Sequence, residues 1–148
     1  MNFFLKSEES YDSAEMLYKV ENYCSCVNRY YYSCLMAAKN YILRTNNWTV
    51  KNYDREYDRA KRKYSRNDVP KEKRGSHNYL INLLQTKLAT SADIEMIEKA
   101  LLITEKISDL KTERVKADYK EIAISFYEAR DCRECAKQVL DFLKQELK

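Results

Sequence analysis

Glycine and proline are almost absent from this sequence, which has one of each among 148 residues. Tight turns, β-hairpins and phosphate-binding loops depend on these residues, because glycine adopts positive φ readily and proline fixes φ for a turn. A chain without them lacks the turns of β-sandwiches, β-barrels and doubly wound α/β folds. We therefore predict an all-α protein made of five or six antiparallel helices.

The length and composition indicate one domain with a substantial core. A chain of 148 residues falls within the roughly 100–200 residues of a single domain, and 13 tyrosines add to its leucines and isoleucines, which argues against disorder. Apolar runs such as 34–38 are far shorter than the ~20 residues of a membrane-spanning helix. With no secretory signal pattern and an odd number of cysteines, five, we expect reduced thiols and a cytoplasmic location without a membrane partner.

Hydrophobic spacing and capping residues predict the helices. The segment 24–44 is apolar nearly all round, which is typical of a helix in the middle of a bundle. The pattern leaves 113–124 unassigned and makes 65–75, with the only proline and glycine, a long loop. The other predicted helices run from a cap at Ser7, Asp12 or Ser13 to residue 19, over 50–64, and over 77–88 after a Ser76 cap. A further helix starts at Thr90 or Ser91, followed by Asp93, and ends near Thr112 with Leu101 facing inward, and the last runs from Ser125 to the C-terminus with Phe126 facing inward.

Positive charge is concentrated in one segment. Residues 51–75 hold ten of the 27 Lys and Arg but only five of the 23 Asp and Glu, so they account for the whole net charge of +4. Basic side chains with interleaved tyrosines can contact phosphates and stack on unpaired bases. The alternative is a solvated helix face laced with carboxylates. The candidate nucleic-acid-binding residues are Arg59, Lys61, Arg62, Lys63, Arg66 and Arg74, with Tyr53, Tyr57 and Tyr64 between or before them.

His77 is the only histidine, which excludes a zinc site of two Cys and two His and a relay of two imidazoles. Near Arg74 and at the start of a predicted helix, it could contact an anion or transfer a proton. The simpler alternative is that its ring packs or caps the helix locally.

Two pairs of cysteines have spacings that resemble metal-ligand pairs. Cys132 and Cys135 share a helical face, but Cys24 and Cys26 would point to nearly opposite sides of theirs. We therefore expect these cysteines to be buried small residues. The sequence predicts no metal site and no cofactor.

Residues 29–42 are more specific than their periodicity. Their order Arg-Tyr-Tyr-Tyr-Ser-Cys-Leu-Met-Ala-Ala-Lys-Asn-Tyr-Ile resembles the signature helix of HEPN domains (higher eukaryotes and prokaryotes nucleotide-binding), which typically reads Arg-x-Tyr-Tyr-Ala-x-x-x-Ala-Ala-Lys. Ser76-His77-x-x-Leu80 and Arg114-Val-Lys-Ala-Asp-Tyr119 are similar to two later segments of that family, in the same order. The signature residues matched are Arg29, Tyr31, Tyr32, Lys39 and Asp118.

The resemblance implies an antiparallel, up-and-down bundle of four main helices plus short helices. The whole chain, 1–148, would be a single HEPN-like domain with a basic helix and loop inserted at about 50–75. It also implies a homodimer and a link to RNA, because many HEPN domains are metal-independent ribonucleases, toxins paired with a minimal nucleotidyltransferase, or parts of antiviral systems.

The catalytic motif of HEPN ribonucleases is an arginine followed, after four to six residues, by a histidine. Arg114 matches the arginine, but no histidine follows it in this sequence. We therefore expect a component of a toxin–antitoxin or defence system that binds RNA or a nucleotide, with a nucleotidyltransferase-type antitoxin or another defence partner. One alternative is an active metal-independent endoribonuclease that uses Arg114 with His77 or Tyr119. Another is a structural homodimeric interaction module, in which Arg114 and Asp118 only pair with each other.

Overall fold

The computed structural model describes residues 1–64, 75–90, 93–119 and 123–148. Within these ranges the chain forms helices and no strand, so the all-α prediction is confirmed. None of the described helices is long and apolar enough to cross a membrane. The helices are α1 (Phe3–Lys19), α2 (Tyr23–Asn46), α3 (Val50–Tyr64), α4 (Ser76–Leu88), α5 (Ile94–Tyr119) and α6 (Phe126–Glu146).

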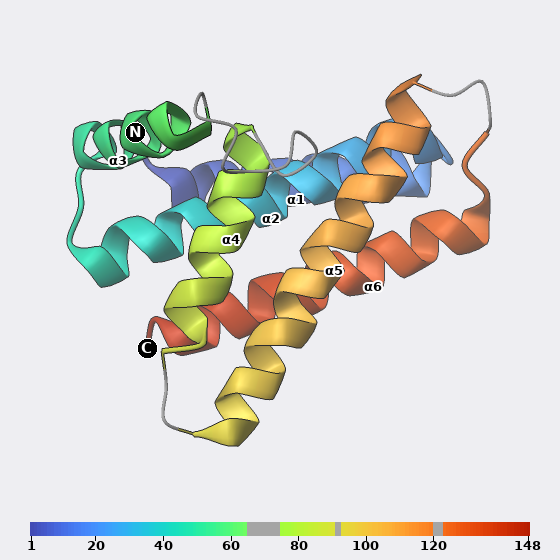
Figure 1. Ribbon diagram of the computed structural model, residues 1–148. Helices are drawn as coiled ribbons and strands as arrows, with labels where there is room; N and C mark the ends of the chain where they lie inside the picture. Colours follow the sequence, from blue (N-terminus) through green and yellow to red (C-terminus); the bar gives the residue numbers. More distant parts are fainter. Residues whose placement is uncertain (65–74, 91–92, 120–122) are drawn as a thin grey trace.

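Helix α2 is the centre of the molecule. It packs against α1, α4, α5 and α6, and Figure 1 shows α4 and α5 crossing in front of the α1–α2 pair, with α6 below. Tyr30, Tyr31 and Leu35 are among its fully buried side chains. A helix with neighbours on several sides must be apolar on all of those sides. The prediction of a central helix over 24–44 is therefore confirmed. Its ten buried residues are Cys26, Val27, Tyr30, Tyr31, Ser33, Cys34, Leu35, Ala38, Tyr41 and Ile42.

The chain turns between helices with little help from glycine. Glu21, between α1 and α2, has φ 62°, and Asn47, after α2, has φ 53°. Asparagine tolerates the left-handed region better than most residues, whereas glutamate adopts it at a cost. Packing of α1 against α2 holds the first of these turns. A scarcity of glycine therefore excludes hairpins without preventing short connections between helices.

Helix α1 begins earlier than predicted. Its first residue is Phe3, and Asn2 is the cap, with its Oδ1 accepting a hydrogen bond from the Leu5 amide at 3.0 Å. The predicted caps Ser7, Asp12 and Ser13 are therefore wrong. Ser7 is instead buried, and its Oγ donates to the Ser33 carbonyl of α2 at 2.8 Å.

Helix α5 is longer than predicted, since it continues past Thr112 to Tyr119. Its last two turns are polar, so hydrophobic spacing could not reveal them. They are held by contacts to other helices, including the ion pair of Lys116 with Glu128 of α6. Tertiary partners thus extend a helix that its own pattern leaves undefined.

Two predicted core positions are wrong. Leu101 of α5 is 47% exposed, because the buried face of that helix follows Ala100, Ile103 and Ile107. Phe126 is 45% exposed at the start of α6, where its ring lies against those of Tyr18 and Tyr23. The predicted Ser125 start of the last helix is confirmed, with Ser125 and Glu128 forming a capping box.

Candidate functional site

His77 meets two tyrosines of α2 where α4 begins. It is the second residue of α4, and its Nδ1 lies 3.0 Å from the hydroxyl of the buried Tyr31. The His77 ring also packs edge-on against Tyr32, with 5.9 Å between ring centroids. The hydrogen-bonding contact with Tyr31 and ring contacts with both Tyr31 and Tyr32 therefore fix the position of the imidazole.

Arg114 of α5 contacts the same two tyrosines. Its guanidinium carbon lies 5.8 Å from the ring centroid of Tyr31 and 5.6 Å from that of Tyr32, and its Nη2 donates to the Tyr32 hydroxyl at 3.3 Å. Its Nε lies 3.0 Å from Asp118 Oδ2, so the two side chains form an ion pair, but this contact does not meet the geometry of a hydrogen bond. His77 and Arg114, distant in sequence, are thus brought together. We call Tyr31, Tyr32, His77, Arg114 and Asp118 the His77–Arg114 cluster.

Three further polar residues surround the cluster. Asn28 of α2 donates to Asp118 at 3.2 Å, and Lys111 of α5 donates to Asn78 of α4 at 2.6 Å. The first contact orients the carboxylate that pairs with Arg114, and the second ties α5 to the start of α4. Sequence reasoning missed all three. Lys111 lies three residues before Arg114, so the two share a face of α5. A predicted helix that continued to Arg114 would have placed these two cations side by side.

The electrostatics of the cluster favour a neutral imidazole. Burial lowers the pKa of His77 below its ordinary value, and the positive charges of Arg114 and Lys111 lower it further. Burial raises the pKa of the Tyr31 hydroxyl, so this phenol keeps its proton. Burial and the charge of Arg114 also lower the pKa of the neighbouring Lys111. With Lys111 counted, two cationic side chains stand at or beside the cluster against one carboxylate, that of Asp118, which gives this region an excess of positive charge.

This excess suits an anion rather than a metal ion. In the described residues, Arg114 Nη1 and His77 Nε2 have no hydrogen-bonding partner, whereas the other polar atoms of these two side chains are in contact with Tyr31, Tyr32 or Asp118. Guanidinium and imidazole nitrogens are good ligands for phosphate oxygens. No group of three or more His, Cys, Asp and Glu side chains within the described ranges could hold a metal ion.

The structure does not bring Tyr119 into the cluster. It is the last residue of α5, and its side chain is 74% exposed. Lys39, a residue of the HEPN signature, lies elsewhere, with its Nζ 4.7 Å from the ring centroid of Phe3 and 4.4 Å from that of Tyr53. Lys39 therefore joins α3 to α1 and α2. Arg29 is exposed on α2 and lies next to the cluster.

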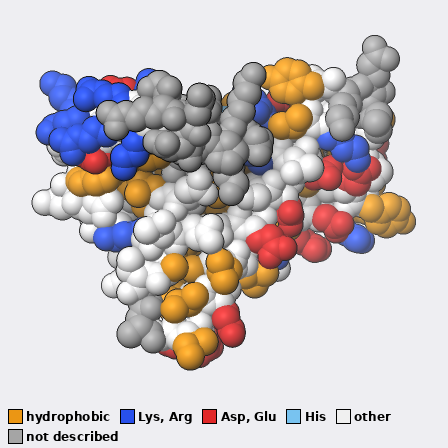
Figure 2. Space-filling model, viewed as in Figure 1, with side chains coloured by type: hydrophobic (Ala, Val, Ile, Leu, Met, Phe, Trp, Pro, Cys, Tyr) orange, Lys and Arg blue, Asp and Glu red, His pale blue; other side chains and the backbone are white. Residues whose placement is uncertain are grey.

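Four of the predicted nucleic-acid contacts lie on α3. Arg59, Lys61 and Lys63 are exposed, as is Arg62, and Figure 2 shows basic side chains gathered over α3, while acidic side chains gather over α5 and α6. Arg59 pairs with Glu56 at 3.0 Å and Lys61 with Asp58 at 3.1 Å. Such exposed pairs contribute little to stability, so these cations stay accessible to a polyanion. Arg66 and Arg74 lie outside the described residues.

The basic helix is connected to the start of α4 by aromatic contacts. Tyr53 and Tyr57 of α3 lie against Tyr79 of α4, with ring centroids 5.7 Å and 5.1 Å apart. Tyr79 is two residues from His77, so α3 contacts the same first turn of α4 that carries His77, although on another side of that helix. Two of the three tyrosines predicted to stack on bases, Tyr53 and Tyr57, therefore pack against another helix of the protein.

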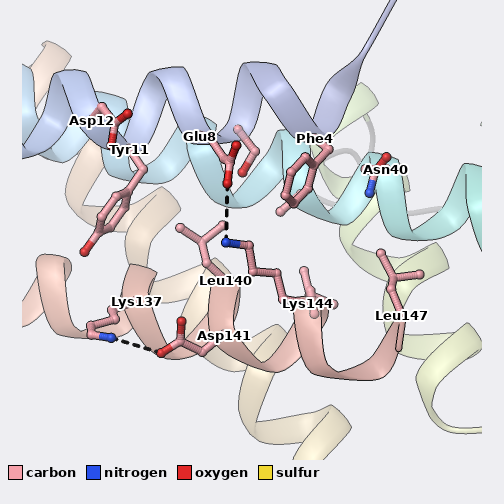
Figure 3. Close-up of a pocket in the computed structure, with 13 residues that line it drawn as sticks. Phe4, Glu8, Tyr11, Asp12, Asn40, Lys137, Leu140, Asp141, Lys144 and Leu147 are labelled. Carbon is pink, nitrogen blue, oxygen red and sulfur yellow. Dashed lines mark hydrogen bonds and ion pairs between the residues drawn. The ribbon is translucent and has the colours of Figure 1, made fainter.

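A separate cavity of about 330 Å³ lies between α1 and α6 (Figure 3). Glu8 and Lys144 form an ion pair across it at 3.4 Å, and Lys137 pairs with Asp141 at 3.1 Å. Its walls include apolar side chains such as Phe4. Because both cations of this cavity are already paired, it lacks the excess of positive charge found at the His77–Arg114 cluster.

Comparisons of the chain with protein-family models, with curated proteins and with solved structures find no match. The chemistry of the His77–Arg114 cluster therefore has to be interpreted from its own geometry.

Proposed function

We propose that this chain is a HEPN-like protein that binds single-stranded RNA, with one backbone phosphate at the His77–Arg114 cluster. The observation that carries the proposal is the convergence of His77 and Arg114 on Tyr31 and Tyr32. A pre-positioned arginine beside an imidazole and a lysine offers a phosphate several charge-assisted hydrogen bonds.

The ion pair with Asp118 prepares Arg114 for this role. Asp118 pairs with Nε of the guanidinium, and Nη2 donates to the Tyr32 hydroxyl. These two contacts fix the orientation of the guanidinium, and therefore of Nη1, before a ligand binds. The Arg114 side chain is 16% exposed. Partial burial strengthens its electrostatic attraction for a phosphate compared with that of an arginine surrounded by water.

Helix α3 supports the same ligand. Its exposed Arg59, Lys61 and Lys63 lie on a helix that contacts the first turn of α4 through Tyr57 and Tyr79, and they add positive surface beyond a single phosphate site. A polyanion that contacts several such cations releases counterions, and its affinity falls steeply as salt concentration rises. The resemblance to HEPN domains favours RNA and, as the setting, a toxin–antitoxin or defence pair.

The test is binding of a fluorescently labelled oligouridylate in EDTA over a series of salt concentrations. We expect Arg114→Gln to weaken binding by about 10- to 100-fold, since hydrogen bonds to charged groups contribute roughly 1.5–3 kcal/mol each. The control is Arg44→Gln, which removes an exposed arginine near the C-terminal end of α2, outside the His77–Arg114 cluster. Equal affinities for the two variants would contradict the proposal.

A second candidate function is metal-independent cleavage of the bound RNA, and the low pKa of His77 favours it. A neutral imidazole can accept the proton of a ribose 2′-hydroxyl. The 2′-oxygen would then bond to phosphorus while the bond to the 5′-oxygen breaks, with Arg114 stabilising the charge on the phosphate. The leaving oxygen takes its proton from water.

Cleavage in EDTA would distinguish the two functions. An active site predicts that His77→Gln abolishes cleavage even at protein concentrations that saturate the RNA, whereas Tyr119→Phe changes neither cleavage nor binding. Intact RNA with the wild-type protein would leave binding as the function.

A further inference from the structure

A shallow groove of about 360 Å³ runs along the α1–α2 pair beside the His77–Arg114 cluster. One face of each helix lines it, because its residues recur at helical spacing on both. We call it the Arg29 groove. Its lining residues are Lys6, Glu9, Ser10 and Ser13 of α1 and Arg29, Tyr32 and Met36 of α2.

Two cations in this groove are available to a ligand. Arg29 and Lys6 are exposed, and within the described part of the chain neither side chain has a hydrogen bond, an ion pair or a ring contact. Helices α1 and α2 are antiparallel, with Ser7 opposite Ser33 and Tyr11 opposite Tyr30. Continued by one turn, this register places Arg29 near Ser13. Seven residues separate Lys6 from Ser13, which is about 10 Å along the helix axis.

The Arg29 groove is continuous with the cluster on two sides. Tyr32 lines the groove and accepts the hydrogen bond from Arg114. Arg29 also lines a neighbouring hollow of about 520 Å³ together with Asn28 and Asp118, the residues that orient Arg114. A ligand that contacts Arg114 therefore has the Arg29 groove next to it.

We infer that the Arg29 groove binds the adjoining nucleotide of the same RNA strand, with its phosphate on Arg29. This inference rests on the proposed RNA binding. An exposed arginine without a partner provides a planar pair of donors that match phosphate oxygens. Lys6 adds a second charge at the other end of the groove.

The polar walls of the groove fit a ribonucleotide. The hydroxyls of Ser10 and Ser13 and the carboxylate of Glu9 are acceptors for a ribose 2′-hydroxyl or for an amino group of a base. The single carboxylate beside two cations leaves the groove with an excess of positive charge, as at the cluster. The ligand is then a strand of at least two nucleotides, one at each site.

The test measures the affinity of the full chain for a short fluorescent oligouridylate at several salt concentrations, with Arg29→Gln and Arg44→Gln as a matched pair. Both arginines are exposed on α2 and lack a partner within the described ranges. We expect Arg29→Gln to weaken binding about tenfold and to reduce the slope of log affinity against log salt by about 0.7, the value for one phosphate contact on a single strand. We expect Arg44→Gln to behave as the wild type.

The outcomes separate the inference from the function on which it rests. If Arg114→Gln weakens binding while Arg29→Gln matches Arg44→Gln, the groove does not bind RNA and the inference fails alone. If the wild-type chain does not bind the oligouridylate, both fail. Far-UV circular dichroism checks that each variant is folded, which we expect for Arg29→Gln and Arg44→Gln because neither side chain has a partner within the described ranges.

Discussion

Two neighbouring tyrosines of α2 belong to two different polar clusters, one on each side of the helix. The Tyr30 hydroxyl donates to Glu15 of α1 at 2.7 Å, and Arg133 of α6 donates twice to the same carboxylate, each time at 2.8 Å. One carboxylate and one guanidinium neutralise each other there. The adjacent Tyr31 faces His77 and Arg114, where the neighbouring Lys111 adds a positive charge beyond the Arg114–Asp118 pair.

The difference shows how the same helix can carry a structural contact and a binding site. In the Glu15–Arg133 pair, both guanidinium nitrogens that face the carboxylate are satisfied, so the pair joins α1 to α6 and leaves no charge for a ligand. In the His77–Arg114 cluster, nitrogens of both residues lack partners within the described ranges. The first arrangement predicts effects on stability and the second predicts effects on RNA binding.

The largest expected effect on stability comes from the Tyr30 side. Tyr30→Phe removes a partly buried hydrogen bond to a carboxylate, and we expect it to lower the free energy of unfolding by about 1.5–3 kcal/mol. RNA affinity should stay unchanged. Urea denaturation with the oligouridylate assay measures both, and a loss of RNA affinity with unchanged stability would reverse the comparison.

A pH titration of RNA binding gives the next effect. The pKa of His77 is lowered in the free protein, and a bound phosphate raises it, so the complex takes up a proton that the free protein lacks. The affinity for RNA should therefore increase as pH falls from about 7.5 to about 5.5. The full increase is about tenfold for each unit by which binding raises the pKa of His77. His77→Gln should remove this dependence, and a variant that retains it would exclude His77 as the titrating group.

Folding stability changes in the opposite direction over the same range. Because His77 has a lower pKa in the folded chain than its ordinary value of 6.5, the unfolded chain binds the proton more readily as pH falls below that value. The folded state is then destabilised progressively until the pKa of the folded chain is reached. The binding titration should therefore be accompanied by circular dichroism at each pH.

The smallest expected effect is that of Tyr31→Phe, which removes the hydroxyl beside His77 Nδ1 but keeps the ring. The contact involves a neutral imidazole, so we expect a loss of about 0.5–1.5 kcal/mol in the free energy of unfolding, less than for Tyr30→Phe. Thermal denaturation of the two variants side by side tests the order. A larger loss for Tyr31→Phe would indicate a charged His77.

The sequence by itself determined the all-α class of the described residues, the position of the central helix and the residue types available for chemistry. The scarcity of glycine and proline predicted helices, the apolar surface of 24–44 predicted a central helix, and the start of α3 at Val50 was predicted correctly. Local rules suffice for such features because helix formation depends on neighbours within about one turn. They failed for the end of α5, where Lys116 is held by a residue of another helix.

Only the tertiary structure decided that His77 and Arg114 belong to one site. The sequence singled out each of them, and also Tyr31, Tyr32 and Asp118, yet their separation along the chain gave no distance between them. That distance depends on α4 and α5 both crossing α2 beside its two tyrosines. Which helices touch is set by packing of whole faces, and such packing brings together residues that helical periodicity cannot relate.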